Sequence, residues 1–401
     1  MPRTDRSSQT PVTALRRVAA RHLWTPDAGL TGARALVLDA DHTLVDIAEV
    51  TPQDDVLDGI LMPGWVNCHA HLELSHHPKP VGTPGLGSPG WVGALYQSPH
   101  QPTPFTAERG ARSARALGTA FFIDTSNSGT TAAAMSAARL RGTVQVECIG
   151  LTEDRWQPAL HHAHHAPTAP GVECRPTAHA PISCAPDLLR AALAPSAIPV
   201  TIHCDEDPAD ITLLNHRRGP WAGFHTHLAT LRPHHPWREA LGRASSGVAL
   251  LDKLELLGPR VGLVHLTATS LLDLDRITRA GSTAVLCPRS NRHITGRLPD
   301  VPAMVARGIP LAIGTDSRAS TPDLDLLAEA AVLREAFPQL PVQTWLHALT
   351  SGGARLLPGR PHAGRIDLGA RPDLLLVEVP AGPNPLERLL DGTRWPRRWL
   401  T

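Results

Sequence analysis

The sequence predicts an α/β protein: a (β/α)8 barrel of the TIM type with a small composite β-sandwich domain formed by both termini. Eight short β-branched or apolar runs alternate with helix-like segments over roughly 250 residues, as eight successive βα units would. No phosphate-binding glycine fingerprint follows the first run, which disfavours the rival doubly wound sheet. Both ends of the chain instead show the alternation of short antiparallel strands.

The predicted strands are bounded by a change from apolar runs to helical periodicity. They cover 64–71, 120–124, 144–149, 172–179, 198–204, 261–265, 283–287 and 310–315. Helices are expected at 106–117, 131–140, 186–193, 249–257, 270–280, 301–307 and 324–337. The segment 75–104 is rich in His, Pro and Gly, which indicates a long loop over the barrel mouth.

The two ends are expected to pair with each other. Residues 33–50 alternate between apolar and polar side chains, and residues 364–379 do the same with turn glycines. The predicted organisation is therefore residues 1–60 as the N-terminal part of a β-sandwich, residues 61–360 as the barrel, and residues 361–401 as the C-terminal part of the sandwich.

Composition excludes several classes of partner. The 401 residues carry 38 Lys+Arg against 37 Asp+Glu, so no basic footprint for nucleic acid or an anionic membrane is present. There is no run of eighteen apolar residues for a membrane span and no continuous apolar region of a secretory signal. The six cysteines contain no CxxC pair, which fits a reducing cytoplasm. We expect a cytoplasmic protein with a small-molecule substrate, and a homodimer is left open.

The first predicted strand ends in His69-Ala70-His71. Side chains alternate along a strand, so both imidazoles face the same way and form a clamp for a divalent metal. The pair is weak evidence alone, because the chain holds 22 histidines. His225-Thr226-His227 has the same spacing and is interpreted as a loop.

Three further residues stand at corresponding strand ends: His203, His265 and Asp316. The C-terminal ends of parallel barrel strands open on one face, so these side chains should converge with the first pair. Each alone is explained by a buried core histidine or a helix N-cap aspartate. Together they predict a metal site.

The ordered motifs PGWVNCHAHLELS, HCDED, VHL, CPRSN and IGTDS resemble the amidohydrolase superfamily, in its branch of cytosine and adenosine deaminases and chlorohydrolases. The terminal GRIDLGARPDLLLVE is similar to the closing strands of that family's composite β-sandwich. The resemblance implies that His69, His71, His203 and Asp316 bind the metal and that His265 contacts the metal-bound water.

The resemblance also bears on the number of metal ions. Two-metal members of the superfamily use a carbamylated lysine on a central strand, and the lysines of this chain are Lys79, in the predicted loop, and Lys253, in a predicted helix. One divalent ion is therefore expected. Three imidazoles and one carboxylate suit zinc, with Fe2+ or Mn2+ left open.

Glu206 follows His203 at a spacing that resembles the deaminase branch, where this carboxyl protonates the substrate ring. We expect Glu206 to shuttle protons, Asp316 to act as first base and His265 to orient the hydroxide. The alternative for the acidic run 205–207 is a solvated loop. The run also departs from the family, whose members usually have small or apolar residues between His and Glu.

Substrate-binding candidates lie past several strand ends. His179, in AHAPIS, resembles a substrate-contacting motif, although a supporting hydrogen bond would explain it equally well. Arg289 is a candidate partner for a substrate carboxylate. The remaining candidates are Glu73, Trp91 as an apolar lid, Ser290, and Asn291, which could instead cap a turn. The histidines of 161–165 are interpreted as a surface run.

HLELS and PRSN are most similar to aminodeoxyfutalosine deaminases. The resemblance implies hydrolytic deamination of 6-amino-6-deoxyfutalosine to futalosine plus ammonia, in menaquinone biosynthesis, by a metal-bound hydroxide. The alternatives are a deaminase or chlorohydrolase acting on methylthioadenosine, S-adenosylhomocysteine, cytosine or a triazine-like ring, and a non-catalytic barrel relative. Only 4% of the residues are aromatic, which leaves few side chains to stack on a purine.

Overall fold

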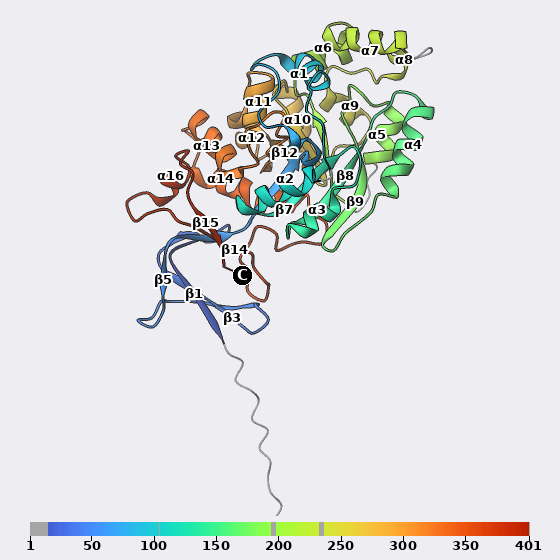
Figure 1. The fold of residues 1–401 in the computed structure, drawn as a ribbon. Helices are drawn as coiled ribbons and strands as arrows, with labels where there is room; N and C mark the ends of the chain where they lie inside the picture. The colour runs from blue at the N-terminus through green and yellow to red at the C-terminus, as the bar shows by residue number, and fades with distance from the viewer. Residues whose placement is uncertain (1–14, 104, 194–197, 232–235, 401) are drawn as a thin grey trace, which may run out of the picture.

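The computed structural model describes residues 15–103, 105–193, 198–231 and 236–400, and it shows a mixed α/β fold (Figure 1). Two parallel four-stranded sheets form its centre, in the orders β6-β7-β8-β9 and β10-β11-β12-β13. Their strands are β6 (Trp65–Ala70), β7 (Thr119–Ser126), β8 (Arg141–Cys148), β9 (Val172–Ala178), β10 (Val200–Cys204), β11 (Val261–His265), β12 (Thr283–Leu286) and β13 (Leu311–Ile313). Each overlaps one predicted run. The strands are almost entirely buried, as expected for parallel strands covered on both faces.

Backbone contacts join the two sheets at both margins. Ala70 forms a parallel bridge with Asp316, and the backbone N–H groups of Thr315 and Asp316 both donate to the carbonyl of His69 at 3.0 Å. At the other margin the N–H of His203 donates to the carbonyl of His179 at 3.1 Å. These bonds bring strand ends that are distant in sequence next to one another.

Helices cover the outside of the sheets (Figure 1). They include α2 (Thr106–Ala116), α3 (Ala132–Ala137), α4 (Glu153–His164), α5 (Pro186–Leu193), α9 (Gly247–Lys253), α10 (Leu271–Ala280), α11 (Pro288–Ile294), α12 (Val301–Ala306), α13 (Leu326–Ala336), α14 (Val342–Leu349), α15 (Ser351–Ala354) and α16 (Pro385–Leu389). Local sequence sets their ends. In α10, the Ser270 hydroxyl accepts from the Asp273 N–H, and Gly281 closes the helix at φ 71°. The predicted surface run 161–165 lies at the end of α4.

Two predicted loops are wrong, because they contain helices. The segment 75–104 includes the last two residues of the 3-10 turn η1 (Leu72–His76) and all of α1 (Gly87–Tyr96). His225-Thr226-His227 lies in α7 (Pro220–Leu231), between α6 (Pro208–His216) and α8 (Trp237–Ala240). The sequence of α1, GSPGWVGALY, has weak helix propensity, and a tertiary bond from the Ser88 N–H to Asp207 supports its first turn.

The two ends of the chain pair in one seven-stranded sheet, ordered β15-β14-β5-β1-β3-β4, with β2 also on β1. The strands are β1 (Arg16–Thr25), β2 (Gly29–Thr31), β3 (Arg34–Leu38), β4 (Leu44–Ala48), β5 (Val56–Pro63), β14 (Leu374–Val377) and β15 (Arg397–Trp399). β14 lies antiparallel to β5, which runs through Gly64 into β6. The C-terminal strands therefore brace the strand that leads to His69.

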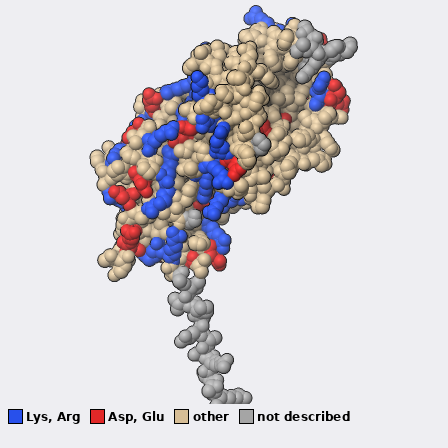
Figure 2. All heavy atoms as spheres, in the orientation of Figure 1, with Lys and Arg blue, Asp and Glu red and all other residues tan. Residues whose placement is uncertain are grey.

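The surface view shows charged side chains of both signs interspersed over the lower part of the molecule, and fewer of them near α1 (Figure 2). Among the described residues, none of the helices is both long enough and apolar enough to cross a bilayer.

Candidate active site

Five side chains predicted to converge do lie together at the ends of their strands. The ring centroid of His69 is 4.8 Å from that of His71, 4.7 Å from that of His203 and 5.8 Å from that of His265. Asp316 Oδ1 lies 3.4 Å from His71 Nε2 and 3.7 Å from His69 Nε2. Residues from four strand ends, spread over most of the chain, thus share one small volume.

The backbone turns sharply where these residues leave their strands. Asp205, His265 and Asp316 have φ values of 47°, 78° and 55°, in the left-handed region that non-glycine residues rarely adopt. Each such residue costs about 1–3 kcal/mol, and such strain clusters at functional sites. Here the strained residues are those at which the chain leaves a strand and turns into the loops around the site.

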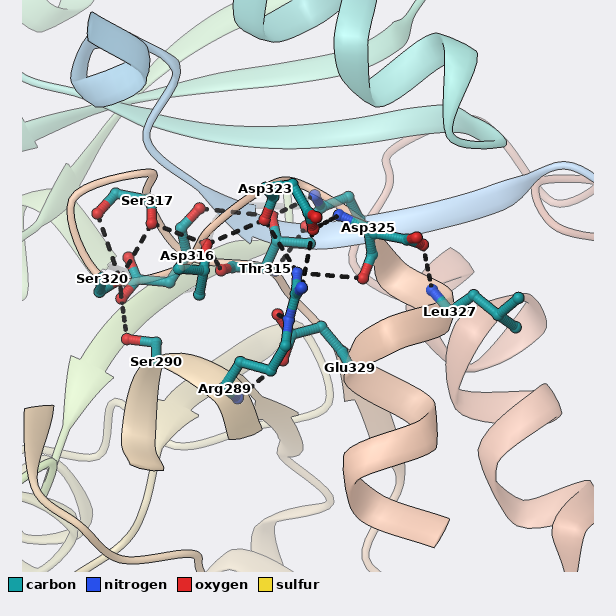
Figure 3. Close-up of polar contacts among 12 residues, drawn as sticks. Arg289, Ser290, Thr315, Asp316, Ser317, Ser320, Asp323, Asp325, Leu327 and Glu329 are labelled. Atoms are coloured by element: carbon teal, nitrogen blue, oxygen red, sulfur yellow. Dashed lines mark hydrogen bonds and ion pairs between the residues drawn. The ribbon is translucent and has the colours of Figure 1, made fainter. Parts of the chain in front are cut away.

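Hydroxyl groups orient the Asp316 carboxylate (Figure 3). Oδ2 accepts from the Ser290 hydroxyl at 2.5 Å and from the Ser320 hydroxyl at 2.9 Å. Oδ1 is therefore left to face the imidazoles of His69 and His71. Burial opposes the charge, but the neighbouring imidazoles, with His71 first, hold the pKa of Asp316 below its ordinary value.

The donor set fits a divalent metal. His69 Nε2 is buried and has no hydrogen-bond partner, which is costly unless a ligand completes it. Its ligand atom belongs to two groups of three, one with His71 and Asp316 and one with His203 and His265, whose atoms lie within 4.8 Å of one another. Burial, followed by the other imidazoles, keeps the pKa of His69 well below its ordinary value, so the ring is neutral and able to ligate.

Asn291 fixes the ring of His265. Its side-chain amide nitrogen lies 2.9 Å from His265 Nδ1, so Nε2 is directed toward Glu206, with Oε1 at 3.7 Å. Burial lowers the pKa of His265 to about 3. The imidazole is neutral at physiological pH.

In the acidic run after β10, Asp205 and Asp207 are buried and Glu206 is partly buried, and each carboxyl has a different task. Asp205 accepts from the backbone of Gly247 at the start of α9. Asp207 accepts from Ala209 at the start of α6 and from Ser88 at the start of α1. Glu206 alone of the three turns toward His265. Burial, followed by the Asp316 charge, raises the pKa of Glu206 to about 7.

The cluster opens into a cavity of about 270 Å³. Imidazole and carboxyl groups form one part of its wall, including His179 and Glu206. Side chains of α1 and α7 form another part, and these include four aromatic residues: Trp91, Tyr96, Trp221 and Phe224. The fold thus concentrates scarce aromatic residues along one wall of the cavity.

Two of the predicted substrate-binding residues line the cavity. His179 does so with Nδ1 held 2.7 Å from the Ser183 hydroxyl. Trp91 does so from α1, and its indole N–H donates to the carbonyl of Ala319 at 3.3 Å.

Arg289 does not face the cavity, which corrects its expected role. Its guanidinium is buried between Glu329, at 2.7 Å, and Asp323, at 2.8 Å, and it also donates to the backbone of residues 323 and 325 (Figure 3). With these acceptors around it, the side chain is occupied by an internal network. The sequence placed it near the site but could not reveal a glutamate forty positions later.

Glu73, Ser290 and Asn291 also take other roles than substrate contact. The Glu73 carboxylate accepts from the Ser126 hydroxyl and from the backbone of residues 127 and 128, so it holds a turn. Ser290 and Asn291 are fully buried in the first turn of α11, where they position Asp316 and His265.

Sequence reasoning missed Glu147, which lies at the end of β8 beside His203 and His179. The available signal was a charged residue near the end of a predicted strand, close to the position that carries ligands on other strands.

Comparison with known proteins agrees with this geometry. A 198-residue segment, 48% of this chain and 47% of the relative, is 32% identical to an aminodeoxyfutalosine deaminase of Deinococcus radiodurans. A 5-methylthioadenosine/S-adenosylhomocysteine deaminase of Syntrophobacter fumaroxidans is 30% identical over 232 residues, 54% of this chain and 47% of the relative. Both matches thus span about half the length of the relative.

Solved structures show the same fold. The Helicobacter pylori aminofutalosine deaminase, in complex with methylthio-coformycin, superposes with a TM-score of 0.77 at 17% identity, over 93% of this chain and 95% of that one. An adenosine deaminase from Xanthomonas campestris with bound zinc superposes with a TM-score of 0.68 at 21% identity, over 93% of this chain and 88% of that one. The model of the amidohydrolase family matches residues 60–393. The resemblance found in the motifs is therefore confirmed, and the chain belongs to the amidohydrolase family.

Proposed function

We propose that this chain is a metal-dependent aminohydrolase that replaces the 6-amino group of an adenine-type nucleoside by oxygen and releases ammonia. The observation that carries the proposal is the gathering of imidazoles and one carboxylate around the unpartnered Nε2 of His69, with Glu206 on the wall of the same cavity. The names of the matched relatives support a deaminase.

His69, His71, His203 and Asp316 would hold one divalent ion, zinc by preference, with Fe2+ or Mn2+ as the next candidates. When bound, such an ion lowers the pKa of a water toward about 7 and makes a nucleophile available at neutral pH.

The chain's own groups handle the protons. Asp316 Oδ1 faces the imidazoles and accepts a proton from the attacking water, while His265 Nε2 orients that water. Glu206 delivers a proton to the ring nitrogen next to the reacting carbon, takes one back from the hydroxyl added to that carbon, and passes it to the departing amine. The proton on Asp316 is released to solvent, from which Glu206 is protonated again. The carbon–oxygen bond forms, the carbon–nitrogen bond breaks, and ammonia leaves.

For the substrate we propose 6-amino-6-deoxyfutalosine, whose product futalosine belongs to menaquinone biosynthesis. Support comes from the HLELS and PRSN motifs and from the names of the Deinococcus and Helicobacter proteins. Methylthioadenosine is a second candidate, because the described residues that line the cavity include no Arg or Lys to pair with a carboxylate.

We also propose that the two parallel sheets close into one (β/α)8 barrel over residues 61–360, with residues 1–60 and 361–401 forming the small second domain. The backbone bonds at both sheet margins and the pairing of β14 with β5 support this division. All six cysteines are free, which supports a reducing compartment such as the cytoplasm.

A substrate panel tests the function. Metal-loaded protein is incubated with aminodeoxyfutalosine, methylthioadenosine, S-adenosylhomocysteine, adenosine and cytosine, and both ammonia and the ultraviolet change to the hypoxanthine form are recorded. We expect turnover of one or more adenine nucleosides and none of cytosine. A chain that binds one metal ion yet deaminates no adenine nucleoside contradicts the proposal.

A further inference from the structure

Glu147 is a buried carboxylate that the proposed reaction does not use. It lies near the end of β8, is 8% exposed, and contributes to the wall of the cavity. Glu147 Oε1 lies 3.2 Å from His203 Nδ1, and this oxygen has no hydrogen-bond partner of regular geometry. Glu147, His179 and His203 together offer ligand-type atoms within 4.8 Å of one another.

The charge of Glu147 needs a compensating partner. A buried carboxylate left without one costs several kcal/mol. Among the ion pairs of the described residues, the one that includes Glu147 is with His203. The carboxylate also has the imidazole of His179 beside it, so the offsetting positive charge comes through these two imidazoles, either from a proton or from a cation bound to the other nitrogen of His203.

The geometry around His203 favours the second arrangement in the loaded protein. Its Nδ1 faces two acceptors, the His179 carbonyl at 3.0 Å and Glu147 Oε1 at 3.2 Å, so the ring carries its proton on Nδ1. Nε2 is then free to ligate. Two other rings of the cluster have uncharged partners at Nδ1: a Thr125 hydroxyl for His69 and the Asn291 amide for His265.

We infer that Glu147 is a positioning residue for the metal ligand His203: it keeps the proton on Nδ1, directs Nε2 toward the ion and strengthens cation binding. The inference rests on the proposed metal centre, and it assigns Glu147 no contact with the reacting atoms. Carboxylate partners of ligating histidines typically contribute 10–100-fold to metal affinity.

The test compares zinc affinity, by competition with a chromophoric chelator, in the wild type, Glu147→Gln, Glu147→Asp and Asp205→Asn. Glu147→Gln keeps the shape and removes the charge, so its zinc dissociation constant should rise by about 10-fold or more. Glu147→Asp keeps the charge at a greater distance from His203, so its zinc dissociation constant should lie between those of the wild type and Glu147→Gln. Asp205→Asn removes a carboxyl two residues from His203 but retains a cap for α9, so its affinity should match the wild type.

Each other outcome overturns the inference. Wild-type zinc affinity in Glu147→Gln, with a raised KM, would make Glu147 a substrate contact instead. Loss of cooperative unfolding in both metal-free Glu147 variants would make it a fold residue. A second zinc equivalent in the wild type that Glu147→Gln lacks would make it a ligand. A wild type that binds no zinc would overturn the proposed function as well, whereas retained wild-type binding in Glu147→Gln would leave that function standing.

Discussion

Glu206 is the side chain on which the proposed proton transfers depend. It faces His265 in the cavity, while Asp205 and Asp207 on either side cap helices. Glu206→Gln retains the volume and removes the transferable proton, so kcat should fall by about 10²–10⁴-fold. Metal content per chain should stay at the wild-type value, since Glu206 is not a ligand. Ammonia release and elemental analysis check both, and activity within a few-fold of wild type would refute the role.

Arg289 is predicted to act on stability and not on substrate choice. Arg289→Met would leave the fully buried Glu329 carboxyl without its cation, which should cost about 3–5 kcal/mol of unfolding free energy. Arg292→Met is the matched control, because its pair with Glu335 is exposed and should contribute at most about 1 kcal/mol.

Urea unfolding of both variants measures the stability effect of Arg289. The ratio of kcat/KM for a carboxylated nucleoside to that for adenosine should be unchanged in Arg289→Met. A selective loss of activity on the carboxylated substrate would restore Arg289 to the binding site.

At the scale of elements, α1 is a wall of the cavity fastened at two points. Asp207 accepts from the Ser88 N–H at its start, and the Trp91 indole donates to Ala319. Trp91→Ala removes a large apolar surface from the cavity and should raise KM by about 10-fold or more, with a smaller effect on kcat. Trp91→Phe keeps an aromatic side chain in the wall, so its KM should be close to that of the wild type. Equal KM values for Trp91→Ala and wild type would show that α1 does not contact the substrate.

The junction after η1 should respond to pH. Burial, together with His76 and His100, lowers the pKa of His77 to about 4. Between pH 6.5 and about 4, His77 is protonated in the unfolded chain and neutral in the folded protein. Its contribution therefore lowers the free energy of unfolding as the pH falls. His77→Gln removes that contribution.

Urea unfolding of metal-free wild type and His77→Gln at several pH values measures the difference. The gap between the two free energies of unfolding should shift in favour of the variant as the pH drops through this window. A pH-independent gap would contradict the assignment.

For the whole molecule, the sequence predicted the strands better than the helices between them. The central strands are short and, apart from β9, almost continuously buried, so their own residues identify most of them. The helix α1 contains Pro89, Gly90 and Gly93, and α7 contains the His225-Thr226-His227 pattern. These segments are helical because of tertiary contacts, such as the bond from Ser88 to Asp207, and local propensity does not report those contacts.

The same distinction applies to the site. His69, His71, His203, His265 and Asp316 were predictable because parallel strands open at one edge, so position at a strand end implies proximity. The partners of Arg289 and the burial of Glu147 depend on which side chains meet across the fold. No spacing in the sequence encodes that Glu329 lies opposite Arg289 or that β8 delivers a carboxylate to His203.

The central claim is that one divalent ion held at these strand ends supports deamination. The most direct measurement is elemental analysis of the purified chain, followed by removal of metal with a chelator, reloading with Zn2+, Fe2+ or Mn2+, and an ammonia-release assay on adenine nucleosides. We predict one ion per chain, loss of activity on removal and recovery on reloading. A folded chain that takes up none of these metals, or that deaminates equally well with and without them, would contradict the account.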